Sequence, residues 1–249
     1  AVSVSGSNNF VDIAGGQRHT CGVLSGGGVN CWGYNGLGQI GDNSTTQRLT
    51  RVSVTGLSGA QKVATGYEHS CALLSGGSVK CWGKNDAGQL GDGTAVNNTV
   101  TVSGVSNALS VKVGENTACV LLQDNTVKCW GGYSYVGIDT SSNQFSPVTV
   151  DNITTATHIV VGSYHSCARL SNGTVKCWGN GGNGQMGSGN TDVIGNGSNE
   201  MGDNLPVVDL GTGRTATAIF TKYWHACAIL DNASVKCWGR NNYGQLGYG

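Results

Sequence analysis

The sequence has little charge, almost no proline and no long apolar run. Only 11% of its 249 residues are charged, against about a quarter in an ordinary soluble domain, and 14 basic residues balance 14 acidic ones. This balance excludes a basic nucleic-acid surface, so we expect no nucleic-acid partner. No stretch approaches the roughly 18 apolar residues of a membrane span, so we expect no membrane insertion. The first residues also lack a secretory leader, which suggests that Ala1 begins a processed mature chain.

Glycine and cysteine are abundant instead, with 42 and 10 positions, and they fall in a repeat. The segment HTCGVLSGGGVNCWGYNGLGQIGD, residues 19–42, returns four times with changes. Its period is about 50 residues, which is typical of solenoids and propellers. One interval is longer because it holds an insertion near residues 187–204.

Each repeat reads as four short strands joined by turns, with no helical periodicity. This pattern predicts an all-β fold, a single β-propeller domain over residues 1–249 with five four-stranded blades. The expected repeats are residues 7–56, 57–104, 105–151, 152–210, and 211–249 plus 1–6. The opening AVSVSG resembles RVSVTG at residues 51–56, so we expect the N-terminal strand to complete the last blade and leave no open edge.

The ten cysteines form five pairs, each separated by nine residues with a turn between them. An odd-numbered loop places the two cysteines opposite each other on antiparallel strands, at a distance that a disulfide tolerates. The expected disulfides are Cys21–Cys31, Cys71–Cys81, Cys119–Cys129, Cys167–Cys177 and Cys227–Cys237.

A metal site is the alternative, because a histidine lies two residues before the first cysteine in four repeats. Each histidine and its two cysteines could offer three ligands to zinc. The third repeat has Thr117 instead of histidine and still keeps both cysteines, which favours disulfides and structural histidines. Five disulfides imply an oxidising compartment, so we expect an extracellular protein, secreted or on a cell surface.

The combined motif resembles the regulator-of-chromosome-condensation repeat, and the match is nearly complete over Gly66–Gly93, GYEHSCALLSGGSVKCWGKNDAGQLGDG. The resemblance covers essentially the whole chain and implies a β-propeller. Relatives commonly have seven blades, and the family's namesake is a nuclear exchange factor for a small GTPase. Disulfides and a neutral surface point instead to secreted members, which include an inhibitor of β-lactamases that binds through one propeller face. The third repeat departs from the motif at residues 132–139.

Candidate binding residues lie where the otherwise constant repeat varies, directly before each histidine position. Charged residues occur at some of these sites, which implies exposure, so the aromatic residues at equivalent sites should be exposed on the same face. Clustered aromatic, arginine and glutamate residues are typical of contact surfaces. The candidates are Arg18, Tyr67, Glu68, Tyr164, Tyr223 and Trp224. A second set consists of Tyr133 and Tyr135 in the degenerate loop of the third repeat and of Tyr34 and Tyr243 in the same loop of other repeats.

No catalytic motif is found, and no cysteine is left over as a nucleophile, so we expect no enzyme activity and no cofactor. The insertion carries Asp192, Glu200 and Asp203, but their spacing matches no calcium motif, and an ordered loop is expected. Six Asn-x-Ser/Thr sites permit glycosylation without arguing for it. The expected function is an extracellular module that binds a protein or glycan through one propeller face. The alternative is self-assembly as a structural subunit, with the terminal strand completing a blade of a neighbouring molecule.

Overall fold

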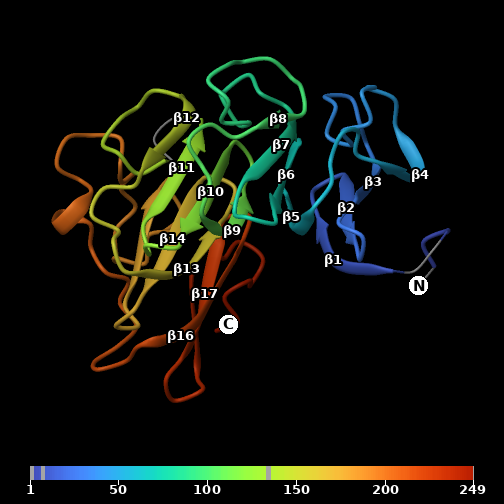
Figure 1. Ribbon diagram of the computed structural model, residues 1–249. Coiled ribbons are helices and arrows are strands. Elements are labelled where there is room, and N and C mark those ends of the chain that lie inside the picture. Colours follow the sequence, from blue (N-terminus) through green and yellow to red (C-terminus); the bar gives the residue numbers. More distant parts are fainter. Residues whose placement is uncertain (1–2, 7–8, 133–135, 249) are drawn as a thin grey trace.

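The computed structural model describes residues 3–6, 9–132 and 136–248 and consists of five antiparallel sheets. Each sheet is a meander in which consecutive strands pair, and the sheets follow one another as blades along an arc (Figure 1). The predicted all-β propeller architecture with five repeated blades is confirmed. In the described part of the chain no helix is long and apolar enough to cross a bilayer.

The first three blades have four strands each, and the last two have three in the part that the structure describes. The strands of the first three are β1 (Phe10–Gly15), β2 (His19–Leu24), β3 (Val29–Gly33) and β4 (Arg48–Ser53); β5 (Ala60–Thr65), β6 (His69–Leu74), β7 (Val79–Gly83) and β8 (Val100–Thr101); β9 (Ala108–Val113), β10 (Thr117–Leu122), β11 (Val127–Gly131) and β12 (Gln144–Thr149). Those of the last two are β13 (Ala156–Val161), β14 (His165–Leu170) and β15 (Val175–Gly179); β16 (Ala216–Lys222), β17 (His225–Leu230) and β18 (Val235–Gly239).

The first strand of each blade faces a common centre. The strands β1, β5, β9, β13 and β16 together line a central channel of about 660 Å³. The channel therefore gives the five blades one common mouth, at which the turns after these strands meet.

The five predicted disulfides are present. In every blade the two cysteines are direct partners on the second and third strands, with Cα atoms 4.0–4.1 Å apart. The disulfides of the first four blades are fully buried, whereas Cys227 and Cys237 of the fifth are half-buried. The cysteines therefore do not serve as metal ligands.

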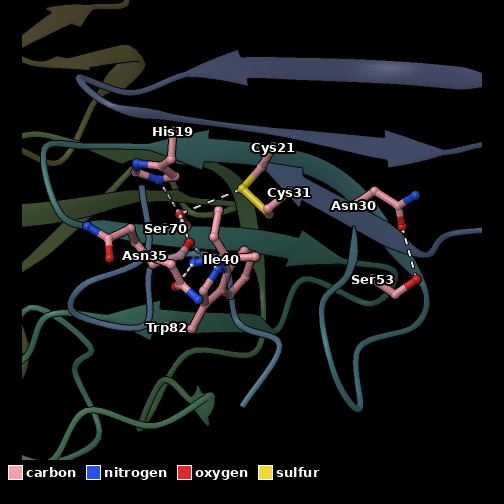
Figure 2. Close-up of a disulfide and its surroundings, with 10 residues drawn as sticks. His19, Cys21, Asn30, Cys31, Asn35, Ile40, Ser53, Ser70 and Trp82 are labelled. Atoms are coloured by element: carbon pink, nitrogen blue, oxygen red, sulfur yellow. Dashed lines mark hydrogen bonds between the residues drawn. A yellow bond between two sulfur atoms is a disulfide. The ribbon is translucent and has the colours of Figure 1, made fainter. Parts of the chain in front are cut away.

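A hydrogen-bonded cluster joins the first blade to the second (Figure 2). The indole of Trp82 donates to the carbonyl of Gln39 over 2.9 Å, and the Ser70 hydroxyl donates to the same carbonyl over 3.2 Å. His19 Nε2 lies 2.8 Å from that hydroxyl, and since its one proton is used, His19 is the donor. All four residues belong to the junction, and these hydrogen bonds join the two blades away from water, while His19 Nδ1 and Gln39 Nε2 are buried there without a hydrogen-bond partner.

The same tryptophan contact recurs at later junctions. Trp130 donates to the carbonyl of Gln89 over 2.8 Å, and Trp238 donates to that of Gln185 over 2.9 Å. The indole of Trp130 also covers Gly91, where an added Cβ would lie 2.8 Å from the indole nitrogen. The tryptophans of the Cys-Trp-Gly anchors in the last four blades are buried, as predicted for a blade-packing core, whereas Trp32 of the first blade is only half-buried.

The hydrophobic clusters lie between blades. One of them combines Val23, Val29 and the disulfide of the first blade with Val63 and Trp82 of the second. A second cluster joins the second blade to the third in the same way. The core of this protein is therefore a series of similar junctions, each made from the rear face of one blade and the front face of the next.

The predicted closure of the ring by the N-terminal strand needs correction. The described residues 3–6 form no strand, and the fifth sheet holds only β16, β17 and β18 in the described chain. Arg51 Nε of the first blade instead donates to the carbonyl of Ser5 over 2.9 Å. The resemblance of residues 1–6 to a fourth strand indicates that this segment can form a strand, but it does not determine which sheet the segment joins. In the structure its Ser5 contacts Arg51 of the first blade.

The insertion of the fourth repeat forms an ordered loop. It contributes two isolated bridges, Lys176 with Val207 and Gly179 with Ile194, and the short 3-10 helix η2 (Gly202–Asn204). The carboxylate of Glu200 accepts hydrogen bonds from three successive backbone N–H groups of residues 195–197. This carboxylate therefore organises the loop itself.

Alanine at the tryptophan-covered glycine should weaken the fold more than alanine at its counterpart in the fifth blade. Both Gly91 and Gly247 have positive φ, which alone costs an alanine about 1–2 kcal/mol. Only at Gly91 does the new methyl also meet an indole, which adds about 1–3 kcal/mol, since nothing lies within 4 Å at Gly247. Urea unfolding of Gly91→Ala and Gly247→Ala measures the difference, and equal losses would contradict the junction geometry.

The fifth disulfide should be reduced before the other four. Thiol–disulfide exchange needs access of a thiolate to sulfur, and only Cys227 and Cys237 are partly accessible. Brief treatment with limiting reductant, followed by alkylation and peptide mass spectrometry, should label this pair first. Simultaneous labelling of all five pairs would show that the fifth blade is covered like the rest.

Candidate functional site

Five tight turns surround one mouth of the channel, each joining the first strand of a blade to the second. In four blades a glycine N–H closes the turn on the residue three positions later, as Gly162 does with the carbonyl of His165 over 2.8 Å. In the fifth blade Lys222 takes the glycine position, and Tyr223 has a positive φ of 51°. The two residues at the tip of each turn are the variable positions identified from the sequence.

Each turn lies beside the residue that follows the third strand of its own blade. A backbone hydrogen bond fixes this neighbour, as in Arg240 N to the carbonyl of Trp224 over 2.9 Å. The side chains of the two positions interact in three blades. The pairs are Arg18 with the Tyr34 ring at 5.8 Å, Glu68 with Lys84 at 3.2 Å, and Trp224 with Arg240 at 4.3 Å.

A continuous row of side chains crosses the last three blades. The hydroxyl of Tyr164 donates to the carboxylate of Glu115 in the preceding blade. The ring of Tyr164 lies 6.3 Å from that of Trp224, and the guanidinium of Arg240 stacks on Trp224 and approaches Tyr243 at 5.8 Å. We call these five residues the aromatic row. It begins with the acidic group of Glu115, and its one basic group, Arg240, lies between Trp224 and Tyr243.

The aromatic row borders a cavity of about 430 Å³ at the mouth of the channel. Rings, a carboxylate, a guanidinium and side-chain amides converge on this space from all five blades. Its lining consists of Gln17, Tyr67, Glu115, Ser163, Tyr164, Tyr223, Trp224, His225, Arg240 and Gln245. Such a mixture offers apolar contact area together with hydrogen-bond donors and acceptors.

The structure brings four of the predicted residues together and leaves two apart. Tyr67, Tyr164, Tyr223 and Trp224 line the same cavity. Arg18 and Glu68 lie at the same mouth but pair within their own blades. In the second predicted set, Tyr243 joins the aromatic row and Tyr34 pairs with Arg18, whereas Tyr133 and Tyr135 lie outside the described residues.

The expected full exposure of Tyr164 and Trp224 needs correction. Tyr223 is half exposed, but Tyr164 and Trp224 are half-buried. The reason is lateral packing, because the two rings contact each other and Arg240 covers one face of Trp224. Comparing the turn sequences with one another does not show that a side chain from elsewhere in the blade, such as Arg240, covers a turn residue.

Two members of the row, Arg240 and Glu115, were missed by the sequence reasoning. Arg240 directly follows the Cys-Trp-Gly anchor, at the position that Lys84 holds in the second blade, where the repeats also vary. The rule used for the turns, variability inside a constant repeat, would have identified this position as well. Glu115 lies in a turn that was considered, but its charge was used only as a sign of exposure.

The buried histidines belong to the junctions. Burial lowers the pKa of His19 and His165 to about 4 and that of His69 to about 3, so all three are neutral at neutral pH. His165 Nε2 lies 3.0 Å from the hydroxyl of Thr221 in the next blade. Among the described residues no three histidine, cysteine, aspartate or glutamate side chains are placed to hold a metal ion.

Stability should fall as the pH drops from about 6.5 toward 4. In that range the unfolded chain binds protons at these histidines and the folded chain does not, so the folded state loses stability relative to the unfolded one. Urea unfolding at several pH values measures the slope. His69→Thr, which copies Thr117 of the third blade, should reduce it, and a flat profile for the unmodified chain would contradict the buried neutral state.

Comparison with known structures shows the fold. Yeast RCC1 (Prp20), solved bound to Kap60, superposes with a TM-score of 0.76 and 19% identity over 96% of this chain and 58% of that one. Human WBSCR16 gives 0.74 and 20% over 96% and 63%. The ectodomain of the Arabidopsis thaliana receptor kinase ACR4 gives 0.54 and 20% over 92% and 68%. The chain thus spans less than two thirds of the first two proteins.

Comparison with the curated protein sequences finds no match. Five segments match the family model of the regulator of chromosome condensation (RCC1) repeat, and they coincide with the first three strands and following loop of each blade. The matched residues are 10–39, 60–89, 109–136, 156–185 and 216–245. Since these segments make up more than half of the chain, the protein belongs to the RCC1 repeat family.

Proposed function

We propose that this chain is an extracellular interaction module that binds a protein partner through the mouth of the channel. The observation that carries the proposal is the aromatic row, in which Glu115, Tyr164, Trp224 and Arg240 form one connected surface. Protein interfaces concentrate their binding energy in tyrosine, tryptophan and arginine residues. Packing within the row holds its rings in place, which lowers the entropy lost on binding.

The scaffold supports a binding role rather than a chemical one. The five disulfides and the tryptophan junctions fix the positions of the turns, while the turn residues differ from blade to blade. A rigid frame with variable loops is a common way to present a binding surface. Yeast RCC1, over part of which this chain superposes, was solved bound to a protein, Kap60.

The disulfides support an extracellular setting. Every blade contains a disulfide, and disulfides form and persist in oxidising compartments and are rare in the cytosol. A nuclear role like that of the family's namesake would leave these bonds without an environment that maintains them.

The proposal is tested by binding measurements on row variants. The unmodified chain is screened against an array of extracellular proteins and against a glycan array, and every hit is measured again with variants. Trp224→Ala and Glu115→Gln should each weaken binding of a protein hit by about 30-fold, or roughly 2 kcal/mol. Glu115→Gln removes the charge and keeps the size of the side chain, so a loss of binding in this variant is not caused by a loss of folding.

Tyr34→Ala provides the matched control, because Tyr34 lies at the same mouth but outside the cavity and pairs with Arg18. Its binding should remain unchanged. Protein hits that tolerate the row variants would overturn the proposed surface, and hits confined to the glycan array would favour a glycan ligand instead.

A further inference from the structure

The charges that line the central channel do not balance. Among the described residues its lining contains two carboxylates, Asp12 and Glu115, and four basic side chains. Asp12 Oδ1 lies 3.5 Å from the ammonium of Lys62, and Asp12 Oδ2 accepts a hydrogen bond from Val63 N over 2.8 Å. The carboxylate of Glu115 accepts from the hydroxyl of Tyr164. Both acidic groups are therefore already engaged by the channel wall.

Two of the basic side chains in the channel have no hydrogen-bonding partner. Lys222 donates to the carbonyl of Gly15 over 3.4 Å, but Lys112 and His158 form no side-chain hydrogen bond or ion pair within the described chain. They belong to the third and fourth blades, which pack against a neighbour on both sides. Their access to the channel therefore does not depend on an end of the arc.

Strand register turns the lysine and a serine of β9 toward the fourth blade. Lys112 pairs with Cys119 and Ser110 pairs with Leu121, so the two side chains lie on one face of the sheet. Cys119 and Leu121 belong to the hydrophobic cluster that also contains Ile159 of the fourth blade. Both polar side chains also line the channel. They therefore face β13, the strand that carries the histidine.

The other repeats show that the fold does not require a charge at the position of Lys112. This position lies opposite the first cysteine of each blade and is apolar in the other four, where the residues are Ala14, Ala64, Val160 and Phe220. Lys112 is half-buried, and bringing a charged group there without a partner costs desolvation free energy. The lysine therefore has a role other than holding the blades together.

A further positive charge lies behind the histidine. Arg169 pairs with His158 in strand register, at a position where the first three blades have Val23, Leu73 and Leu121. Its Nη1 donates to the carbonyl of Ala216 over 3.5 Å, and its Nε is buried without a hydrogen-bond partner. Burial, and after it the charges of Lys112 and Arg169, lowers the pKa of His158. No described acidic group neutralises this positive charge.

We propose that Ser110, Lys112 and His158, here called the channel cluster, bind a small oxyanion, either free phosphate or the phosphate group of a small molecule. A hydroxyl, an ammonium and an imidazole all donate hydrogen bonds to anionic oxygen atoms. The channel volume of about 660 Å³ accommodates a ligand of this size. The anion supplies the missing negative charge, and Arg169 attracts it from behind the channel wall.

The NMR signals of the His158 imidazole measure binding directly, because an anion beside the ring raises its pKa. Titration with inorganic phosphate should raise the pKa of His158, while the signals of the buried His19, His69 and His165 stay unchanged. Glucose 6-phosphate, with glucose as its uncharged counterpart, identifies the source of the oxyanion. Tighter binding than inorganic phosphate indicates a phosphorylated small molecule, and equal or weaker binding indicates the free anion. An unchanged His158 with both phosphate probes would overturn the proposal.

Lys112→Ala copies Ala64 of the second blade and should weaken phosphate binding by about tenfold or more, since a charge-assisted hydrogen bond is lost. Without phosphate the same substitution should raise the pKa of His158, because the repelling charge is gone. Lys128→Ala removes an equal charge from the third strand of the same blade and should bind phosphate like the unmodified chain. Binding that survives Lys112→Ala, or that Lys128→Ala weakens equally, would contradict the channel site.

Discussion

The fold depends on the contact between the tryptophan of one blade and the loop of the blade before it. The indole donates to a glutamine carbonyl and covers a glycine, as Trp130 does with Gln89 and Gly91. This contact fixes the distance and orientation between neighbouring sheets, and the valines and disulfides around it form the core. The hydrogen bond is found at three of the four junctions, and at the third junction Trp178 covers Gly137 while its indole nitrogen lacks a hydrogen-bond partner. Because neighbouring blades pack in this one way, all five turns end at one mouth of the channel.

A constant scaffold with variable turns separates stability from recognition. Residues buried between blades hardly change from repeat to repeat, whereas the turn tips pair differently in each blade. The first two blades form isolated pairs, and the last three form the connected row from Glu115 to Tyr243. The proposed binding surface thus rests on about two positions per blade, which lie apart from the residues buried in the junctions.

Much of the fold followed from the repeat itself, because its period, strand alternation and cysteine spacing are local features. The common mouth also followed, since equivalent turns of a symmetric array must meet. Three points did not follow. The half-burial of Trp224 depends on Arg240 from another strand. The position of residues 3–6 depends on Arg51. The open ends appear only when exposure is compared between equivalent positions, as for Ile13 and Val63.

The central claim is that repeated junctions hold five blades in an open arc, whose two ends approach each other at the channel, where Lys222 Nζ donates to the carbonyl of Gly15 over 3.4 Å. Hydroxyl-radical footprinting of the dilute protein tests it most directly, because oxidation reports the solvent exposure of each side chain. The account predicts strong oxidation of Ile13 and Val235, and protection of Val63 and Val79 at equivalent positions in the second blade. Equal protection at all four residues would mean that the first and fifth blades are covered like the others, and would contradict the open arc.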